Sequence, residues 1–266
     1  ASHLIRMTPF WRSHALWPLA TYVVAMGLLA GMHLDLAIAQ RWFYDAAAGG
    51  WLGRHAFWAE ELLHEGGGVL VRAIGLAALA AWLASWKVAR LAPYQRALLY
   101  FVLALALTNG LTGLLKRFTN IDCPWDLETF GGRFPYIGLL ADRPDALRHA
   151  ACFPGAHSAS GFALVALYFV LRDVDRDKAW IGLLIGLGLG AVFAFAQEAR
   201  GAHFLSHDLT SAAIAWCVSL SLYALFQSRS TTLPALRPAS WYSTASAAAS
   251  SPTNGVGSTS ARNSPR

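Results

Sequence analysis

Residues 94–116 read YQRALLYFVLALALTNGLTGLLK, and within this stretch charge is confined to Arg96 and Lys116 near the two ends. Leucine and alanine dominate it, and it lacks the alternation of polar and apolar residues that marks a half-buried β-strand. An α-helix of about 20 apolar residues spans the hydrocarbon core of a bilayer. The stretch therefore predicts a transmembrane helix that ends with Lys116 at a membrane surface.

The remaining chain has the composition of a membrane protein. Of its 266 residues, 56% are hydrophobic and only 14% are charged, whereas charged residues make up about 25% of a typical soluble domain. A soluble protein built from such helices would have too little polar surface. The net charge of +6 fits the Lys and Arg of cytoplasmic loops, so we do not interpret it as a sign of nucleic-acid binding.

Six segments have the length and composition of a membrane span: approximately 14–34, 66–86, 94–116, 155–172, 179–198 and 207–226. We expect an all-α, polytopic membrane bundle of six transmembrane helices within residues 14–227. The first segment is too long for the apolar core of a signal peptide, so we expect it to be retained. Residues 1–13 are then an N-terminal segment, and the Ser-, Ala-, Thr- and Pro-rich residues 228–266 a disordered tail.

Basic residues predict the orientation of these spans. With six crossings, the basic flanks all fall on one side: Arg6, Arg12, Lys87, Arg90, Arg96, Arg172, Arg176, Lys178, Arg229 and Arg237. Because Lys and Arg are enriched on the cytoplasmic side, we expect a protein of the bacterial inner membrane with both termini in the cytoplasm. Residues 35–65, 117–154 and 199–206 would then face the periplasm.

Three polar clusters fall in or beside the last two of these outward loops. They are KRFTNIDCP at 116–124, PGAHS at 154–158 and RGAHFLSHD at 200–208. Lys, Arg and His that converge at one membrane surface indicate a site for an anionic head group.

The third cluster carries the clearest chemical pattern. His203 and His207 are four residues apart, so they share a face of a helix that includes both. Arg200 can join that face, and Asp208 is adjacent to His207. An imidazole beside a cation and a carboxylate indicates either a nucleophile with an orienting partner or a pair of metal ligands.

The other two clusters suit phosphate binding. Pro154 is typical of a helix start, whose free N–H groups bind anions, and Gly155 would let the backbone approach a phosphate closely. His157 is placed to donate a proton to a leaving oxygen. The candidate phosphate-binding residues are Lys116, Arg117, Gly155, Ser158 and Arg200. For Lys116 and Arg117, anchoring at the membrane surface is the alternative.

Together the clusters resemble the signature of the type 2 phosphatidic acid phosphatase superfamily, which reads K-x6-R-P, P-S-G-H and S-R-x5-H-x3-D. Lys116 and Pro124 match the first motif, Pro154 and His157 the second, and His203 the third. The resemblance covers roughly residues 60–225 and includes the order of the motifs and the six-helix context.

The chain departs from this signature at several positions. Cys123 stands where the first motif has Arg, and Gly155-Ala156 replaces Ser-Gly. Gln197 occupies the Arg position six residues before His203, with Arg200 about one turn later. His207 occupies the usual Asp position, and Asp208 follows it immediately, so either could orient His203.

The resemblance implies hydrolysis of a phosphate ester or diphosphate of a membrane lipid, with no metal and no other cofactor. His203 would attack phosphorus to give a phosphohistidine, and His157 would protonate the leaving oxygen and then activate water. His207 or Asp208 would orient His203. Undecaprenyl diphosphate, lipid A phosphates, phosphatidylglycerol phosphate and phosphatidic acid are the candidate substrates.

The long outward loop adds two expectations. Cys123 and Cys152 both lie in it, and a periplasmic location permits a disulfide between them, two free buried thiols being the alternative. Cys217 lies within a span and is expected to be a packing residue. The candidates for reading the substrate are Trp125, Asp126, Arg133 and Tyr136, for which packing of the loop is the alternative.

Three other functions fit the same residues. A lipid-to-lipid phosphotransferase would use the phosphohistidine with a lipid acceptor in place of water. A zinc enzyme could use His203, His207 and Asp208, although the sequence offers no clear third ligand or base beside them. A binding or transport protein could retain the pocket without catalysis. The sequence does not define the oligomeric state.

Overall fold

The computed structural model describes residues 9–139 and 141–228, and this part of the chain is mostly helical. The greater part of the expected N-terminal segment and nearly all of the expected tail lie outside the described residues. Within these described residues, five helical stretches are long and apolar enough to cross a membrane, which is typical of a multi-pass membrane protein. They are Pro9–Gly31, Trp58–Ala84, Ala92–Asp126, Arg176–Ala199 and Leu205–Gln227.

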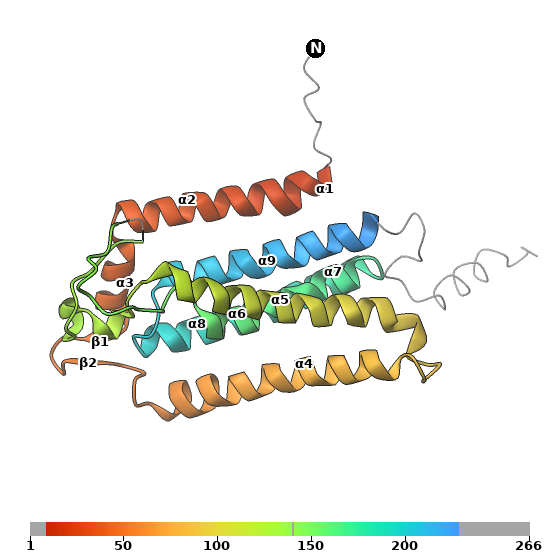
Figure 1. Cartoon of the computed structure of the whole chain (residues 1–266), viewed down its shortest axis with the longest axis horizontal. Helices are drawn as coiled ribbons and strands as arrows, with labels where there is room; N and C mark the ends of the chain where they lie inside the picture. The colour runs from red at the N-terminus through yellow and green to blue at the C-terminus, as the bar shows by residue number, and fades with distance from the viewer. Residues whose placement is uncertain (1–8, 140, 229–266) are drawn as a thin grey trace, which may run out of the picture.

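These stretches contain the long helices of Figure 1. Their elements are α1 (Pro9–Trp11), η1 (Arg12–Leu16), α2 (Trp17–Gly31), η2 (Trp58–Gly66), α4 (Gly67–Ala84), η3 (Ala92–Tyr94), α5 (Gln95–Thr119), α8 (Arg176–Ala199) and α9 (Leu205–Ser228). The second stretch begins earlier than the expected residue 66. Glu60 and Glu61 explain the difference, because acidic side chains are stabilising in the first turn of a helix and do not end it.

The sixth expected span corresponds to a shorter apolar helical stretch, Ala156–Arg172, so six crossings remain a prediction. It consists of α6 (Ala156–Phe162), η6 (Ala163–Val165) and α7 (Ala166–Arg172). This stretch is the most enclosed part of the bundle and packs on α5, α8 and α9. A methyl group added at Gly186 of α8 would lie 2.3 Å from the backbone nitrogen of Val165, so glycine allows the two helices to approach closely.

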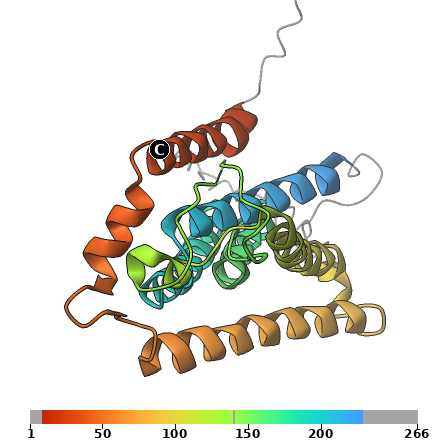
Figure 2. The ribbon, with the colours of Figure 1, turned by 60° about the vertical axis from the view of Figure 1, so that its left-hand side comes forward.

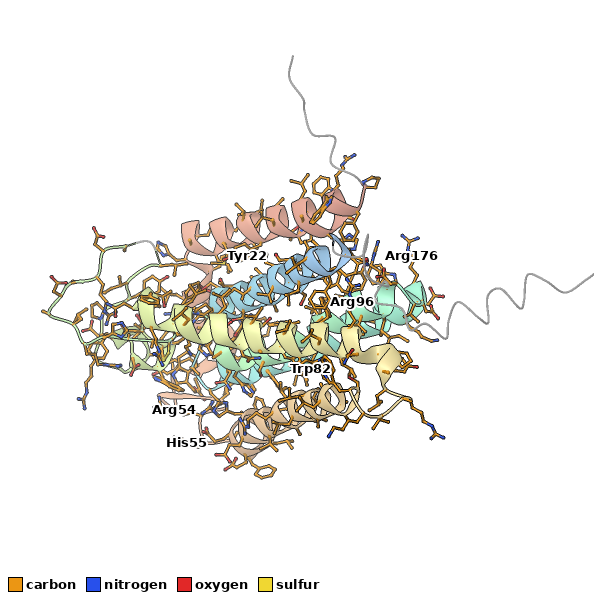
Figure 3. All side chains as sticks on the ribbon, turned by 45° about the vertical axis from the view of Figure 1, so that its right-hand side comes forward. Tyr22, Arg54, His55, Trp82, Arg96 and Arg176 are labelled. Atoms are coloured by element: carbon orange, nitrogen blue, oxygen red, sulfur yellow. A yellow bond between two sulfur atoms is a disulfide. The ribbon has the colours of Figure 1, made fainter. Side chains whose placement is uncertain are left out.

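The links between the helices separate into two ends of the bundle. The links after α2, α5 and α8 lie at the end marked by β1 and β2, whereas those after α4 and α7 lie at the opposite end (Figure 1). Arg54 and His55 belong to the first end, and Arg96 and Arg176 lie toward the second (Figure 3). The three polar clusters therefore lie at one end of the bundle.

A cap of short elements covers this end. It comprises α3 (Leu34–Trp42), β1 (Tyr44–Asp45), β2 (Gly50–Trp51), η4 (Pro124–Asp126) and η5 (Glu128–Phe130). The loop of residues 120–155 lies in front of the ends of the central helices, with α2 and α4 on either side of them (Figure 2). The hairpin of β1 and β2 was not expected from the sequence. Its turn forms because the Asp45 carboxylate accepts the N–H groups of Ala47 and Ala48 at 2.9 and 3.1 Å.

Aromatic side chains join the cap to the end of α8. Trp51, Phe130 and Phe204 pack in one buried cluster with Ala199. Gly201 follows α8 with φ +74°, and a Cβ there would lie 2.3 Å from the Trp51 ring. Glycine at this position lets the chain turn directly after α8, within the third polar cluster.

Candidate active site

His203 and His207 form the centre of the site. The Nδ1 atoms of the two rings are 3.2 Å apart, at hydrogen-bond distance, and both side chains are buried. His203 precedes α9 and is not part of it, so the pair forms across the helix start. Because Nδ1 of His203 contacts His207, Nε2 is the ring nitrogen of His203 that is available to contact a substrate.

The surroundings of His203 favour a neutral imidazole. Burial lowers the pKa of His203 well below its usual value of 6.5, and the positive charge of Lys116 lowers it further. The backbone of Cys152 acts in the opposite direction and offsets part of the fall in this pKa. A neutral ring keeps a lone pair for nucleophilic attack at ordinary pH.

Asp208 is directed away from this pair. The Ser158 hydroxyl donates a hydrogen bond to its Oδ1 at 2.5 Å, and both residues are almost completely buried. Lys116 interacts electrostatically with the carboxylate, and Glu198 lies against it. A Cβ at Gly155 would lie only 2.4 Å from Oδ1, so glycine here makes room for Asp208.

Asp35 of α3 fixes the start of α9 beside these residues. Its Oδ1 accepts the backbone N–H of Ser206 at 3.0 Å, and the side chain is buried. This contact satisfies one of the free N–H groups at the helix start and places a negative charge at the positive end of the helix. It therefore positions the first turn of α9, which carries His207.

His157 is held from several sides. Its Nε2 donates to the backbone carbonyl of Leu63 at 2.9 Å, since a carbonyl can only accept. Its ring stacks on Phe193 with centroids 4.4 Å apart and meets the His64 ring edge to face at 4.8 Å. The neutral ring therefore has its free lone pair on Nδ1. His157 and His203 interact electrostatically, which places them in one site.

A directed chain of hydrogen bonds runs from Arg200 to His64. Arg200 donates to both carboxylate oxygens of Glu60 at 3.0 and 2.6 Å, and its Nη1 donates to Gln197 Oε1 at 2.8 Å. This fixes the Gln197 amide so that its Nε2 faces His64 Nδ1 at 2.8 Å. The Nδ1 atom then accepts, and neutral His64 carries its proton on Nε2.

The family comparison covers most of this site. The sequence model of the PAP2 superfamily matches residues 97–231, about half of the chain. The protein belongs to the PAP2 superfamily. Its members are phosphatases and related phosphoesterases, so the family indicates a phosphatase-type activity. Searches of curated proteins and of solved structures found no match.

The matched region of this PAP2 protein contains several of the predicted residues that the structure brings together: Lys116, Gly155, His157, Ser158, His203, His207 and Asp208. Glu60 and His64 lie outside it, yet they join the same site through Arg200 and Gln197. The sequence interpretation missed both, together with Asp35 and Glu198. An ionisable residue inside an apolar helical segment marks a functional region by default, and this signal could have identified His64 and Glu198.

Three predicted phosphate ligands have other partners in the structure. The first is Gly155, whose N–H donates to the His207 carbonyl at 3.3 Å. Arg200 is directed to Glu60 and Gln197, and Ser158 to Asp208. Arg117 is exposed, and in the described part of the chain its side chain has no hydrogen-bond or ion-pair partner. Lys116 is the predicted cation whose charge acts on both rings of the histidine pair.

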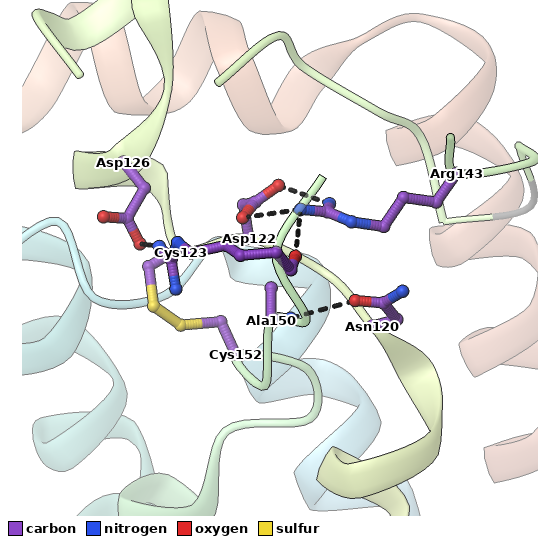
Figure 4. Close-up of polar contacts among 8 residues, drawn as sticks. Asn120, Asp122, Cys123, Asp126, Arg143, Ala150 and Cys152 are labelled. Carbon is purple, nitrogen blue, oxygen red and sulfur yellow. Dashed lines mark hydrogen bonds and ion pairs between the residues drawn. A yellow bond between two sulfur atoms is a disulfide. The ribbon is translucent and has the colours of Figure 1, made fainter. Parts of the chain in front are cut away.

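The loop candidates are also dispersed. Trp125 lines a cavity that includes Arg200, and the Arg54 guanidinium lies 4.8 Å from the centre of its ring. The Asp126 carboxylate instead forms an ion pair with Arg148 at 2.9 Å (Figure 4). Arg133 is exposed. The fourth candidate, Tyr136, lines a cavity of about 30 Å³ that also reaches Asp35 and His207.

A disulfide joins Cys123 and Cys152, with the Cα atoms 5.1 Å apart (Figure 4). The same loop is held by the Arg143 guanidinium on the Asp122 carboxylate and by Asn120, whose side-chain oxygen accepts the Ala150 N–H at 2.9 Å. The loop thus ties the end of α5 to the chain before α6. Cys217, expected to pack, is instead exposed on α9.

The metal alternative finds no donor set in the described part of the chain. No three His, Cys, Asp or Glu side chains come together there in a group that could hold a metal ion. His203 and His207 are bound to each other, and Asp208 is turned toward Ser158.

Proposed function

We propose that this PAP2 protein is a membrane phosphatase that hydrolyses a lipid phosphate or diphosphate through a phosphohistidine intermediate. The observation that carries the proposal is the geometry of His203. Its Nδ1 lies 3.2 Å from that of His207, its Nε2 has no hydrogen-bond partner in the described part of the chain, and its pKa is lowered by burial and by Lys116. These are the properties of a preorganised nitrogen nucleophile.

The reaction follows from the arrangement of the three histidines. The Nε2 lone pair of His203 attacks phosphorus while the bond from phosphorus to the leaving oxygen breaks. His157 in its protonated form delivers the Nδ1 proton to that oxygen, which leaves as a neutral alcohol or a lipid phosphate. Water then attacks the phosphohistidine and gives its proton to His157, so inorganic phosphate leaves and His203 is restored.

Lys116 supplies the charge that this reaction needs. Negative charge develops on the phosphoryl oxygens in the transition state, and a fixed cation in a buried site stabilises it strongly. His207 holds the ring of His203 and shares the cation that forms during attack. We assign these orienting contacts to His207 and not to Asp208, whose carboxylate is bonded to Ser158.

We further propose that the site faces the periplasm of a bacterial inner membrane, with both termini in the cytoplasm. The polar clusters lie at one end of the bundle, and the links at 85–94 and 173–175 lie at the other (Figure 1). The first of these links carries Lys87 and Arg90, and the second is flanked by Arg172 and Arg176. Lys and Arg mark the cytoplasmic side. The substrate would then be a phosphorylated lipid of the outer leaflet.

The test is phosphate release by the detergent-solubilised protein. Undecaprenyl diphosphate, a lipid A phosphate, phosphatidylglycerol phosphate and phosphatidic acid are offered separately in the presence of EDTA, beside His203→Ala. Release that persists with EDTA and disappears in the variant supports the proposal. Release abolished by EDTA points to a metal enzyme, and binding of the lipids without release points to a binding or transport protein.

A further inference from the structure

An open polar cavity lies beside the candidate active site. Its volume is about 390 Å³, within the range of ~300–1,000 Å³ that is typical of small-ligand sites. The residues that line it are Arg54, His55, Glu60, Glu61, Trp125 and Arg200. Arg54 and His55 lie at the same end of the bundle as the polar clusters (Figure 3).

Arg200 connects this cavity to His157. It lines the cavity, and it begins the hydrogen-bond chain through Gln197 to His64, whose ring contacts that of His157. In the proposed reaction His157 protonates the leaving oxygen. The cavity is therefore connected through Arg200, Gln197 and His64 to the histidine that would protonate the leaving oxygen.

The walls of the cavity carry balanced charge. Arg54 and Arg200 are positive, and Glu60 and Glu61 are negative. A second phosphate would face two carboxylates, and an apolar chain would have to desolvate four charged groups. A hydroxyl group suits these walls better, because it donates to a carboxylate and accepts from a guanidinium or an imidazole.

We propose that this cavity is a subsite for a hydroxyl-bearing head group, such as glycerol or a sugar, that joins the scissile phosphate to the rest of the lipid. The proposal rests on the phosphatase function proposed above. Glu61 is exposed and its carboxylate has no partner among the described residues, so it is available to accept from a hydroxyl. Arg54 and His55, also exposed, are the donors.

Two small phosphate esters of equal carbon length test the subsite. Glycerol 3-phosphate and n-propyl phosphate share the phosphoryl group and differ only in two hydroxyls. Their dissociation constants are measured for full-length His203→Ala in detergent, a background that binds without turnover. One hydrogen bond to a charged group predicts that glycerol 3-phosphate binds about 10-fold tighter.

Substitutions in the same background locate the preference. Glu61→Ala should remove the difference between the two esters without weakening n-propyl phosphate. Glu65→Ala is the matched control, because Glu65 is exposed one turn further along η2 and does not line the cavity. It should leave the difference intact.

The outcomes separate this proposal from the phosphatase function. Equal affinities of the two esters, or the same loss in Glu61→Ala and Glu65→Ala, overturn the subsite. Tighter binding of n-propyl diphosphate than of glycerol 3-phosphate would assign the cavity to a second phosphate and overturn it also. Phosphate release by the unmodified protein is measured separately, so its absence refutes the phosphatase while the affinities still decide the subsite.

Discussion

Removal of the Ser158 hydroxyl should destabilise the protein and impair its site. The hydroxyl has one proton, and its oxygen lies 3.1 Å from the Gly155 carbonyl oxygen but closer to the charged Oδ1 of Asp208. The Ser158 proton therefore goes to Asp208 at 2.5 Å, where both side chains are inaccessible to water. Ser158→Ala removes the donor to this carboxylate oxygen, and water cannot reach the site to replace it.

The size of the effect follows from this contact. A buried hydrogen bond to a charged group contributes about 1.5–3 kcal/mol, and Ser158→Ala creates almost no cavity because only one atom is lost. We expect a loss of about 2 kcal/mol in the free energy of unfolding, or roughly 30-fold in the folding equilibrium. The released carboxylate also interacts with Lys116, so we expect the kcat of phosphate release to fall about 10-fold.

Ser160→Ala provides the control on the same helix. Ser160 is half-buried, and its hydroxyl donates only to the His157 carbonyl, within α6, at 2.6 Å. Its replacement should change stability by less than about 0.5 kcal/mol. Both variants are compared by thermal unfolding in detergent and by phosphate release. Equal losses of stability and of phosphate release in the two variants would show that the hydrogen bond from Ser158 to Asp208 contributes no more than that of Ser160.

Three further predictions concern pH, His64 and the disulfide. Because the pKa of His203 is lowered, its imidazole stays neutral in mild acid, and kcat/KM should be maintained below pH 6.5. Lys116→Met removes a positive charge and lets this pKa rise, so the fall of kcat/KM in acid should move to higher pH, and an unmoved profile would contradict the prediction. His64→Asn keeps an acceptor for the Gln197 amide and should retain activity, whereas His64→Phe leaves that amide donor unpaired and should lower kcat/KM about 10-fold. Equal kcat/KM values for the two variants would refute a role of this hydrogen bond in catalysis. Reduction of the Cys123–Cys152 disulfide, which closes a separation of 29 residues, should lower the free energy of unfolding by ~3–4 kcal/mol. The reduced protein should therefore melt at a lower temperature than the oxidised protein, and equal melting temperatures would disprove this.

Much of the fold was predictable because the length of an apolar segment can be read directly from consecutive residues of the sequence. The stretch around residues 94–116 became α5, and the links predicted to share a side share an end of the bundle. Length and composition were least informative for Ala156–Arg172. That stretch is enclosed by α5, α8 and α9, so its environment comes from neighbouring helices and not from its own sequence.

The partners of the charged residues could not be read from the sequence. Arg200 follows the end of α8, and spacing alone suggested that it faces the same site as His203. In the structure it pairs with Glu60, which lies 140 positions earlier in the chain. Such a pair depends on how η2 docks against α8, a tertiary contact that no local pattern encodes. The same docking brings His64 to Gln197.

The relation between His207 and Asp208 follows from helix geometry once the neighbours are known. Successive residues of an α-helix point about 100° apart, so two adjacent side chains at the start of α9 cannot both serve one imidazole. His207 lies over His203, four residues earlier, and Asp208 points instead toward α6, where Ser158 donates to it. The absence of a Cβ at Gly155 leaves the space that Asp208 occupies. His207 in the orienting position and Gly155 two residues before His157 are therefore linked features. Gly155 makes room for Asp208, whose carboxylate joins α6 to α9, and the histidine pair of His203 and His207 is left to perform the proposed chemistry.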